Sequence, residues 1–333
     1  MTIGGLVDGV PWLALKQRLD DAKARTWIGP ADGPASAALI EADLSTSSTD
    51  TGFSAAQLVS SRGFVLTAYF GKFVTTFGAP IGSPMICFAR SATTASWLSA
   101  ALLPDRWAVA GSPAPILTGA WPPVAGHEDL LTLSAPTGDQ LNDVTTAGQR
   151  LVWFGYGAGK QYHLWTWQPG EAVQLLVNPP PSSGQQNCCA ASTDDQIAWL
   201  RGTGYNEDSG YAAFDQVDLM TAPLPINLLP VTGCRVRTVP QPSMSNPGVV
   251  GGGYWANAAA PANDPSAGYI YVVRLTDGRM WKIPERGPQQ PWTKILYVTS
   301  SEIALLEGYW GHPEWASTVV RYDLASLGPG EAP

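Results

Sequence analysis

Residues 144–156 (VTTAGQRLVWFGY) contain the end of one apolar strand, a tight polar turn and a second apolar strand that ends on an aromatic residue. The same arrangement occurs at residues 59–70 (VSSRGFVLTAYF), 191–205 (ASTDDQIAWLRGTGY) and 298–310 (VTSSEIALLEGYW). Two short strands joined by a tight turn form a β-hairpin. The sequence therefore predicts a hairpin that is repeated along the chain.

A third short strand follows each of these hairpins. The third strands are expected at residues 84–90 (PMICFAR), 162–167 (YHLWTW), 211–219 (YAAFDQVDL) and 318–324 (TVVRYDL), and a fourth strand at 172–177 (AVQLLV). Two weaker units fit residues 106–136 and 235–286. A period of about 40 to 50 residues indicates a propeller or a solenoid. We therefore expect about six units of four strands, with five or seven as alternatives.

This strand pattern resembles the TolB-like and WD-like β-propellers over most of the chain, although no WD dipeptide or Gly-His signature is present. The resemblance implies an all-β fold with a single propeller of about six four-stranded blades. It implies little about function, because lectins, lyases, hydrolases and protein-docking scaffolds share this fold.

The predicted domain organisation is an N-terminal segment over residues 1–28, the propeller over 29–327 and a tail over 328–333. Within residues 11–24, Trp12, Leu15 and Leu19 fall on one face of a helix, so a short amphipathic helix is expected there. The last unit lacks an outer strand, which leaves a sheet edge to be covered. We expect an N-terminal strand, at residues 25–28 or 37–44, to close the ring by pairing with that unit.

Composition excludes several classes of protein. The 333 residues are 45% hydrophobic and only 14% charged, which rules out a disordered chain. The 35 Gly and 29 Pro are typical of many short strands joined by turns. A net charge of −8 gives no basic surface for nucleic acid, and no window of 18 apolar residues predicts a membrane span.

The four cysteines provide evidence on the cellular location of the protein. Cys188 and Cys189 are adjacent and Cys234 follows about one repeat later, so one interpretation is a disulfide from Cys188 or Cys189 to Cys234. The alternative is that all the cysteines are small buried residues. With the disulfide, we expect an extracellular or periplasmic protein whose leader has been removed; a cytoplasmic location stays open because residues 1–10 lack the features of a signal peptide.

Acidic and imidazole groups recur in the loop between the second and third strands of several units. In a propeller, equivalent loops of successive blades lie on one face around the axis, so these groups are expected to form a ring. The predicted ligand-binding residues of these loops are His127, Glu128, Asp129, Glu207, Asp208, Asp264, His312 and Glu314. No cofactor is predicted, with calcium held by Glu128, Asp129, Glu207 and Asp208 as the alternative. Ordinary solvated turns explain the same residues.

The 14 tryptophans divide by position. Trp121, Trp255, Trp310 and Trp315 lie at or beyond strand ends and are predicted to stack on a ligand such as a sugar. Large rings inside strands fill the space between blades. The tryptophans expected in the core are Trp153, Trp165, Trp167, Trp199 and Trp281.

The function that follows is a non-enzymatic binding or interaction module, whose ligand is a glycan or a protein partner. One alternative is a secreted glycan-active lyase or hydrolase, in which His127, His312 and Glu314 are the candidate catalytic residues near the axis. Another is a structural component of a larger assembly, since low charge and apolar loops suit lateral packing. The sequence leaves the oligomeric state undetermined.

Overall fold

The structure is a computed structural model. It describes residues 2–18, 23–33, 36–41, 57–70, 73–92, 97–112, 114–124, 130–136, 140–156, 162–177, 185–193, 195–203, 214, 216–240, 248–259, 268–284, 291–309 and 317–333. In these ranges the chain forms β-strands and one short 3-10 helix, with no α-helix. None of the helices described there has the length and hydropathy that a membrane crossing requires.

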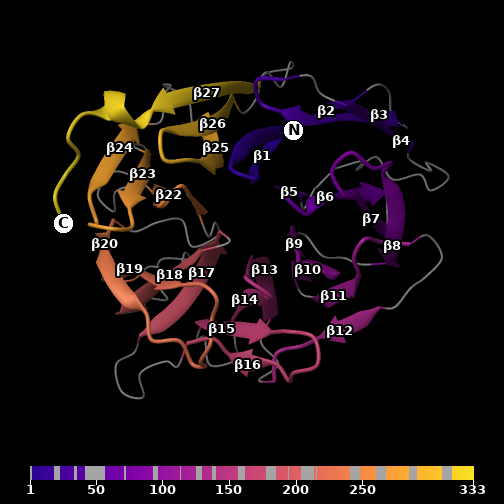
Figure 1. The fold of residues 1–333 in the computed structure, drawn as a ribbon, viewed down its shortest axis with the longest axis horizontal. Helices are drawn as coiled ribbons and strands as arrows, with labels where there is room; N and C mark the ends of the chain where they lie inside the picture. Colours follow the sequence, from indigo (N-terminus) through magenta and orange to yellow (C-terminus); the bar gives the residue numbers. More distant parts are fainter. Residues whose placement is uncertain are drawn as a thin grey trace. The chain divides into compact units, whose positions relative to one another are not determined.

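The strands form seven small antiparallel sheets, six with four strands and one with three (Figure 1). The fold is therefore a seven-bladed β-propeller, which confirms the all-β prediction. The number of blades is seven, one of the two alternatives to the expected six. Within each sheet the strands follow one another in chain order, as expected for repeated hairpins.

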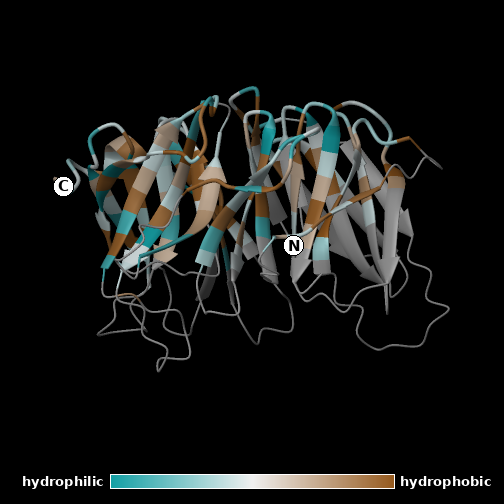
Figure 2. Ribbon diagram, turned by 90° about the horizontal axis from the view of Figure 1, so that it is seen from below, coloured by the Kyte–Doolittle hydropathy of each residue, from teal (hydrophilic) through white to brown (hydrophobic). Residues whose placement is uncertain are grey.

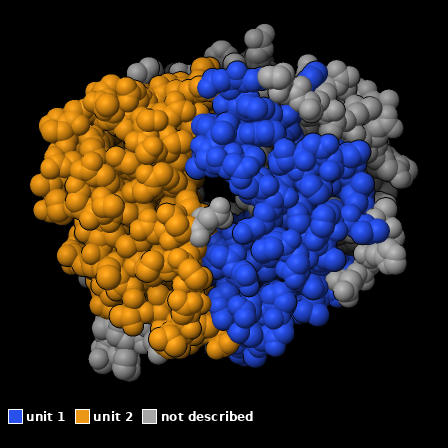
Figure 3. Space-filling view, in the orientation of Figure 1, with its two compact units in different colours: residues 1–158, 167–173 blue, residues 159–166, 174–333 orange. Residues whose placement is uncertain are grey.

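The first compact unit comprises residues 1–158 and 167–173 (blue in Figure 3). It holds three four-stranded sheets, in the orders β1-β2-β3-β4, β5-β6-β7-β8 and β12-β11-β10-β9, together with β13 and β14. The strands are β1 (Thr2–Val7), β2 (Val10–Arg18), β3 (Lys23–Pro30), β4 (Ser36–Glu41), β5 (Gln57–Ser60), β6 (Gly63–Phe70), β7 (Phe73–Ala79), β8 (Ile86–Ala92), β9 (Trp97–Leu102), β10 (Arg106–Ser112), β11 (Ala114–Ala120), β12 (Leu131–Leu133), β13 (Gln140–Ala147) and β14 (Arg150–Tyr156).

The second unit comprises residues 159–166 and 174–333 (orange in Figure 3). It holds the remaining strands of the fourth sheet, whose order is β13-β14-β15-β16, and the sheets β17-β18-β19-β20, β21-β22-β23-β24 and β25-β26-β27. The elements are β15 (Tyr162–Trp167), β16 (Gln174–Leu175), β17 (Gln186–Ser192), β18 (Gln196–Thr203), β19 (Gln216–Pro223), β20 (Cys234–Val239), β21 (Val249–Gly251), β22 (Tyr254–Ala259), β23 (Tyr269–Arg274), β24 (Met280–Pro284), β25 (Pro291–Val298), β26 (Glu302–Tyr309), β27 (Ser317–Asp323) and the 3-10 helix η2 (Leu324–Leu327).

The N-terminal residues form a sheet of their own, and the predicted helix over residues 11–24 is wrong. Asp8 and Gly9, at φ angles of 50° and 77°, make a two-residue turn between the paired residues Val7 and Val10. A two-residue Asp-Gly turn with positive φ angles suits the twist of a β-hairpin. β2 then pairs with β1 on one side and with β3 on the other. The backbone hydrogen bonds of these two pairings stabilise a strand, although the apolar residues of this segment have the spacing of a helix.

The predicted closing strand is also wrong. In the part of the chain that the structure describes, β1 to β4 pair with one another in one sheet, and the last sheet contains only β25, β26 and β27. The reason is that the first 41 residues supply four strands of their own, so no N-terminal strand is left over for the last sheet.

The tryptophans predicted for the core are confirmed as buried. Trp153 on β14 and Trp199 on β18 are each 1% exposed, and Trp165, Trp167 and Trp281 are also buried. Buried apolar residues run consecutively along the central strands β14, β18, β23 and β26, and hydrophobic residues are brown in Figure 2. Their burial is the main force that holds each sheet against its neighbours within a unit.

Residues 328–333, predicted as a tail, lie along the outer strand of the sixth sheet. Met280 and Glu331 exchange two backbone hydrogen bonds, of 3.0 and 2.7 Å. The indole N–H of Trp281 donates to the carbonyl oxygen of Gly328 at 2.9 Å, and Lys282 Nζ lies 2.8 Å from Glu331 Oε1. This segment therefore covers the edge of β24, which would otherwise expose unpaired backbone groups.

One turn of the sixth sheet depends on glycine. Gly252 and Gly253 connect β21 to β22 at φ angles of 56° and 82°. A Cβ atom at Gly252 would overlap the backbone of Thr299 and Ser300, in the turn between β25 and β26. The run Gly251-Gly252-Gly253 thus serves the close approach of two turns.

Candidate functional site

Ten of the predicted ligand-binding residues lie outside the described residues. They are His127, Glu128, Asp129, Glu207, Asp208, Asp264, Trp310, His312, Glu314 and Trp315. The predicted ring of loop groups, the alternative calcium site and the candidate catalytic residues all depend on them, so these stay predictions.

The two tryptophans of this set that the structure describes are core residues, and their predicted role in stacking on a ligand is wrong. Trp121 is 7% exposed, packs in a cluster with Val65 and Leu102, and donates its indole N–H to the carbonyl oxygen of Arg62 at 3.0 Å. Trp255 on β22 is 1% exposed. Although both residues follow apparent strand ends in the sequence, neighbouring residues cover their rings, which leaves no face for a sugar.

The predicted disulfide is not formed. All four cysteines are among the described residues, and none is in a disulfide. Cys188 and Cys189 lie on β17 and Cys234 on β20, with β18 and β19 between them in one sheet. Three strand spacings amount to about 14 Å, well beyond the Cα separation of about 7 Å that a disulfide can span. The interpretation assumed that these cysteines belong to adjacent repeats, whereas they belong to one.

Asp143 occupies an irregular position on β13, the first strand of the fourth sheet. Asn142 pairs with Phe154 and Val144 pairs with Trp153, so Asp143 is the extra residue of a β-bulge. Its φ angle of 26° lies in the left-handed region, which Asp and Asn tolerate better than most residues. Bulges of this kind redirect a side chain and are frequent beside functional sites.

The carboxyl group of Asp143 is poorly solvated. Burial raises its pKa from 3.8 to about 6. No donor among the described residues forms a hydrogen bond or ion pair with it that offsets this burial. The bulge itself is fixed by the Val144 N–H, which donates to Ser99 Oγ on β9 at 2.6 Å. Asp143 is therefore held in place by its backbone while its carboxyl group has capacity for a ligand.

The first strand of two other sheets also contains a bulge, with different side chains. On β17, Cys189 has a φ angle of 61° and the pairing with β18 shifts between Cys188 and Ala191. On β25, Leu296 is the extra residue opposite β26. The bulge is thus a repeated feature of the first strand, and of these three sheets the fourth is the one that places a carboxylate there.

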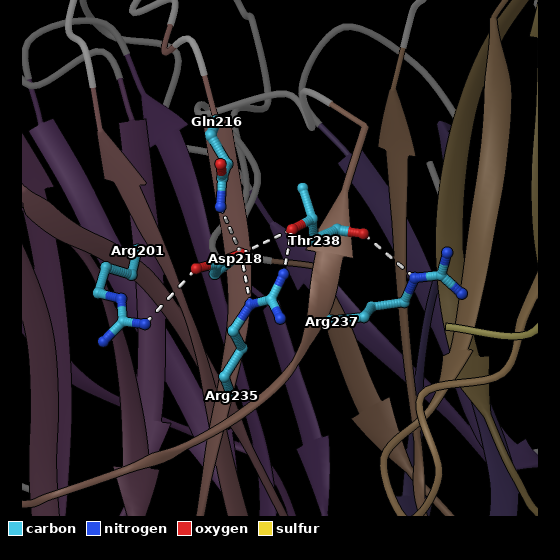
Figure 4. A network of polar contacts seen from close by, with 6 residues as sticks. All are labelled: Arg201, Gln216, Asp218, Arg235, Arg237 and Thr238. Carbon is cyan, nitrogen blue, oxygen red and sulfur yellow. Dashed lines mark hydrogen bonds and ion pairs between the residues drawn. The ribbon is translucent and has the colours of Figure 1, made fainter.

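A second polar cluster surrounds Asp218 on β19 (Figure 4). Arg201 on β18 and Thr238 on β20 are its cross-strand neighbours. Asp218 Oδ1 accepts hydrogen bonds from Arg235 Nε at 2.9 Å, Thr238 Oγ1 at 2.9 Å and Gln216 Nε2 at 3.2 Å. Arg201 Nη2 lies 3.5 Å from the other carboxylate oxygen.

The partners of Asp218 decide its charge state. Burial, with 8% of the residue exposed, raises the pKa of the carboxyl group, but hydrogen bonds from Arg235, Thr238 and Gln216 outweigh it and hold the pKa below 3.8. Asp218 is ionised at neutral pH and its acceptor sites are already used. We conclude that this cluster stabilises the fifth sheet, and that Asp143 is the better candidate for contact with a ligand.

No set of three His, Cys, Asp or Glu side chains in the described ranges could hold a metal ion. Asp143 was not predicted as a site residue, because the pattern of residues 144–156 is that of a regular hairpin. The signal was the polar pair Asn142-Asp143 just ahead of that hairpin, where an apolar alternation would continue a strand.

No family model matches the sequence, and no curated protein matches it. Solved structures match by fold. A puromycin hydrolase (S511A mutant, complexed with PGG) has 12% identity and a TM-score of 0.54 over 98% of this chain and 52% of its own. An oligogalacturonate lyase in complex with manganese has 9% identity and a TM-score of 0.56 over 98% of this chain and 97% of its own. A putative TolB from Agrobacterium tumefaciens has 14% identity and a TM-score of 0.44 over 75% of this chain and 86% of its own.

The chain spans about half the length of the first two structures that it matches, the puromycin hydrolase at 52% and a prolyl endopeptidase at 47%. At these identities the likeness shows the fold alone. Together with the seven sheets, it confirms at the level of fold the resemblance to propellers that the strand pattern indicated.

Proposed function

We propose that this propeller is a non-enzymatic binding module and that its ligand, a glycan, contacts the carboxyl group of Asp143. The observation that carries the proposal is Asp143 itself: a carboxyl group on a β-bulge, with a left-handed φ angle and a pKa raised by burial. Such a combination of strain and desolvation is concentrated at functional positions.

Asp143 lowers the stability of the folded chain, whereas an Asn at this position would not. A pKa raised from 3.8 to about 6 corresponds to up to about 3 kcal/mol against the ionised folded form at neutral pH. Asn has nearly the same shape and also tolerates positive φ angles. A residue that lowers the stability of the fold in this way is typical of a functional site, where function requires a residue that is unfavourable for folding.

The ligand class follows from the chemistry of the group. A carboxylate accepts hydrogen bonds from sugar hydroxyls, and its protonated form can also donate one. With a pKa of about 6, Asp143 offers both forms at a mildly acidic pH and mainly the carboxylate at neutral pH. A calcium ion, held by the predicted ligands Glu128, Asp129, Glu207 and Asp208, would be an additional contact in the same proposal.

The test is a glycan array probed with the full chain and with Asp143→Asn, each with and without calcium. Asp105→Asn is the matched control, because Asp105 is exposed and the same change there removes a charge from a solvated position. We expect binding by the wild type and by Asp105→Asn, and at least a tenfold loss of affinity in Asp143→Asn. Absence of wild-type binding on the array would exclude a glycan ligand.

A second candidate, a glycan-active lyase or hydrolase, is favoured by the pKa of Asp143, which suits a general acid or base near neutral pH. The oligogalacturonate lyase that matches nearly the full length of both chains suggests the first substrate to assay, with manganese present. Turnover that is lost in Asp143→Asn and in His127→Ala or His312→Ala would replace the binding module with this enzyme.

A further inference from the structure

Residues 328–333 (GPGEAP) lie along the outer strand of the sixth sheet, β24, in the way that a bound peptide would (Figure 1). Glu331 exchanges two backbone hydrogen bonds with Met280, at 3.0 and 2.7 Å. The indole N–H of Trp281 and the guanidinium group of Arg279 each donate to a backbone carbonyl oxygen of the segment. Peptides that bind along a strand combine backbone pairing with side-chain contacts in the same way.

The contact selects glycine at position 330. Gly330 has a φ angle of 68°, in the left-handed region that favours glycine. A Cβ atom there would lie 2.7 Å from Cε2 of Trp281 and 3.0 Å from Cγ of Arg279. Both the backbone conformation and the space beside the indole ring therefore exclude a larger residue.

The surface that the segment contacts is held in place by the sheet. Trp281 belongs to a hydrophobic cluster that includes Ile283 of the same strand. The centroids of the Trp281 and Tyr254 rings are 5.9 Å apart, and the Arg274 guanidinium carbon lies 5.7 Å from the centroid of the Trp281 ring. These contacts come from β22, β23 and β24, so the surface should keep its shape when the segment leaves.

Charge selects an acidic residue after the glycine. Lys282 Nζ lies 2.8 Å from Glu331 Oε1. Burial lowers the pKa of Arg237 on β20, and the charge of Glu331 opposes that shift. Together with Arg279, these side chains form a basic surface in a chain whose net charge is −8. The surface is complementary in charge to an acidic peptide.

The segment itself is held weakly. Apart from Gly330 its residues are exposed, so it buries little apolar surface. The side chains of Lys282 and Glu331 are 39% and 55% exposed, and ion pairs in such positions contribute little. Leu324 and Leu327, just before the segment, pack against the hydrophobic cluster. Residues 328–333 can therefore open locally while the rest of the sheet stays folded.

We propose that the outer side of β24 is a peptide-binding site that residues 328–333 cover as a reversible cap. Its ligand is an extended segment of another protein in which a glycine is followed by Glu or Asp. That ligand replaces the cap and makes the same contacts, with the glycine beside Trp281 and the carboxylate at Lys282. The proposal does not depend on the glycan ligand proposed for Asp143.

The test is the fluorescence anisotropy of a labelled peptide with the sequence of residues 328–333, titrated with the full chain. Gly330→Val should release the cap, because the new side chain collides with Trp281, and it leaves β24 unchanged. The matched control is Ala332→Val, at an exposed position of the same segment. We expect saturable binding by Gly330→Val, and an affinity at least about tenfold lower for the wild type and for Ala332→Val, where the cap competes.

A second variant, Gly330→Val with Glu331→Lys, also sets two lysines against each other at Lys282. Faster hydrogen exchange of the Met280 amide, which donates to Glu331, reports release of the cap in both variants. Addition of Lys282→Glu to Gly330→Val should weaken peptide binding at least about fivefold.

The absence of peptide binding to both released variants would overturn the proposal, and so would a Met280 amide that stays protected in both. Equal binding by the wild type would show that residues 328–333 do not cover the site. Equal binding of a peptide in which valine replaces the glycine would contradict the recognition of glycine beside Trp281.

Discussion

Asp143 and Asp218 are both carboxylates on strands with restricted access to solvent, yet their environments act on them in opposite directions. Asp218 lies on a central strand, between neighbours that donate to it from both sides. Asp143 lies at a bulge on the first strand of its sheet, where the extra residue has no directly paired partner. The pKa is lowered in the first case and raised in the second. Cross-strand neighbours, more than burial, decide what a carboxylate contributes to this fold.

The largest effect is expected from removing Asp218. Asp218→Ala leaves Arg235 and Arg201 without their counter-charge and should lower the free energy of unfolding by about 3 kcal/mol. Urea unfolding at neutral pH measures this loss, with Asp105→Ala as an exposed control. The wild type should lose the contribution of Asp218 as the pH falls below 3.8 through the lowered pKa of the folded state. A loss below about 1 kcal/mol would show that the network contributes little.

The next effect has the opposite sign. Asp143→Asn should raise the free energy of unfolding by about 2 kcal/mol at about pH 7, because it removes a carboxylate whose charged form burial disfavours. The folded-state pKa is raised, so the wild type loses stability as the pH rises from 3.8 through about 6, and the advantage of the variant should vanish below about pH 3.8. Unfolding curves from about pH 3.5 to 7.5 test this. A difference that does not depend on pH would contradict the assignment to Asp143.

The smallest effect is expected from removing one hydrogen-bond donor to Asp218, the hydroxyl of Thr238. Thr238→Val removes one hydroxyl donor but leaves the two arginines in place, and should cost about 0.5 to 1 kcal/mol, because water can reach this exposed position. Combined with Asp218→Ala, it should cost less than it does alone, since its acceptor is already gone and only the hydrogen bond that the hydroxyl accepts from Arg235 Nη2 is left to lose. Full additivity of the two changes in urea unfolding would mean that Thr238 acts through another contact.

Much of the fold could be predicted because the hairpin repeat is local. Residues 144–156 fold as the end of β13, a turn and β14, and the tryptophans inside the strands are buried as expected. The N-terminal sheet was missed because Trp12, Leu15 and Leu19 have helical spacing, while the pairing of β2 with β1 and β3 depends on residues that the spacing does not show. The Asp8-Gly9 pair was the local signal against the helix.

The candidate site was less predictable for physical reasons. Trp121 follows a strand end in the sequence, but its burial depends on Val65 and Leu102, which come from other strands of the unit. Asp143 has an ordinary side chain in the sequence, and only the bulge and the lack of hydrogen-bond donors to it among the described residues make it unusual. Desolvation is a property of the packed molecule and leaves no pattern in a single sequence.

The approach of Gly252 to the backbone of Thr299 and Ser300 has a practical consequence for engineering this chain. The two turns occupy one space, so an insertion in either would have to displace the other. The turn at Gly148 is different, because a Cβ atom there would meet nothing within 4 Å. A fluorophore tag or a grafted loop therefore belongs at the exposed Gln149, in the turn between β13 and β14, while Gly148 itself is kept because its φ angle of 64° disfavours other residues.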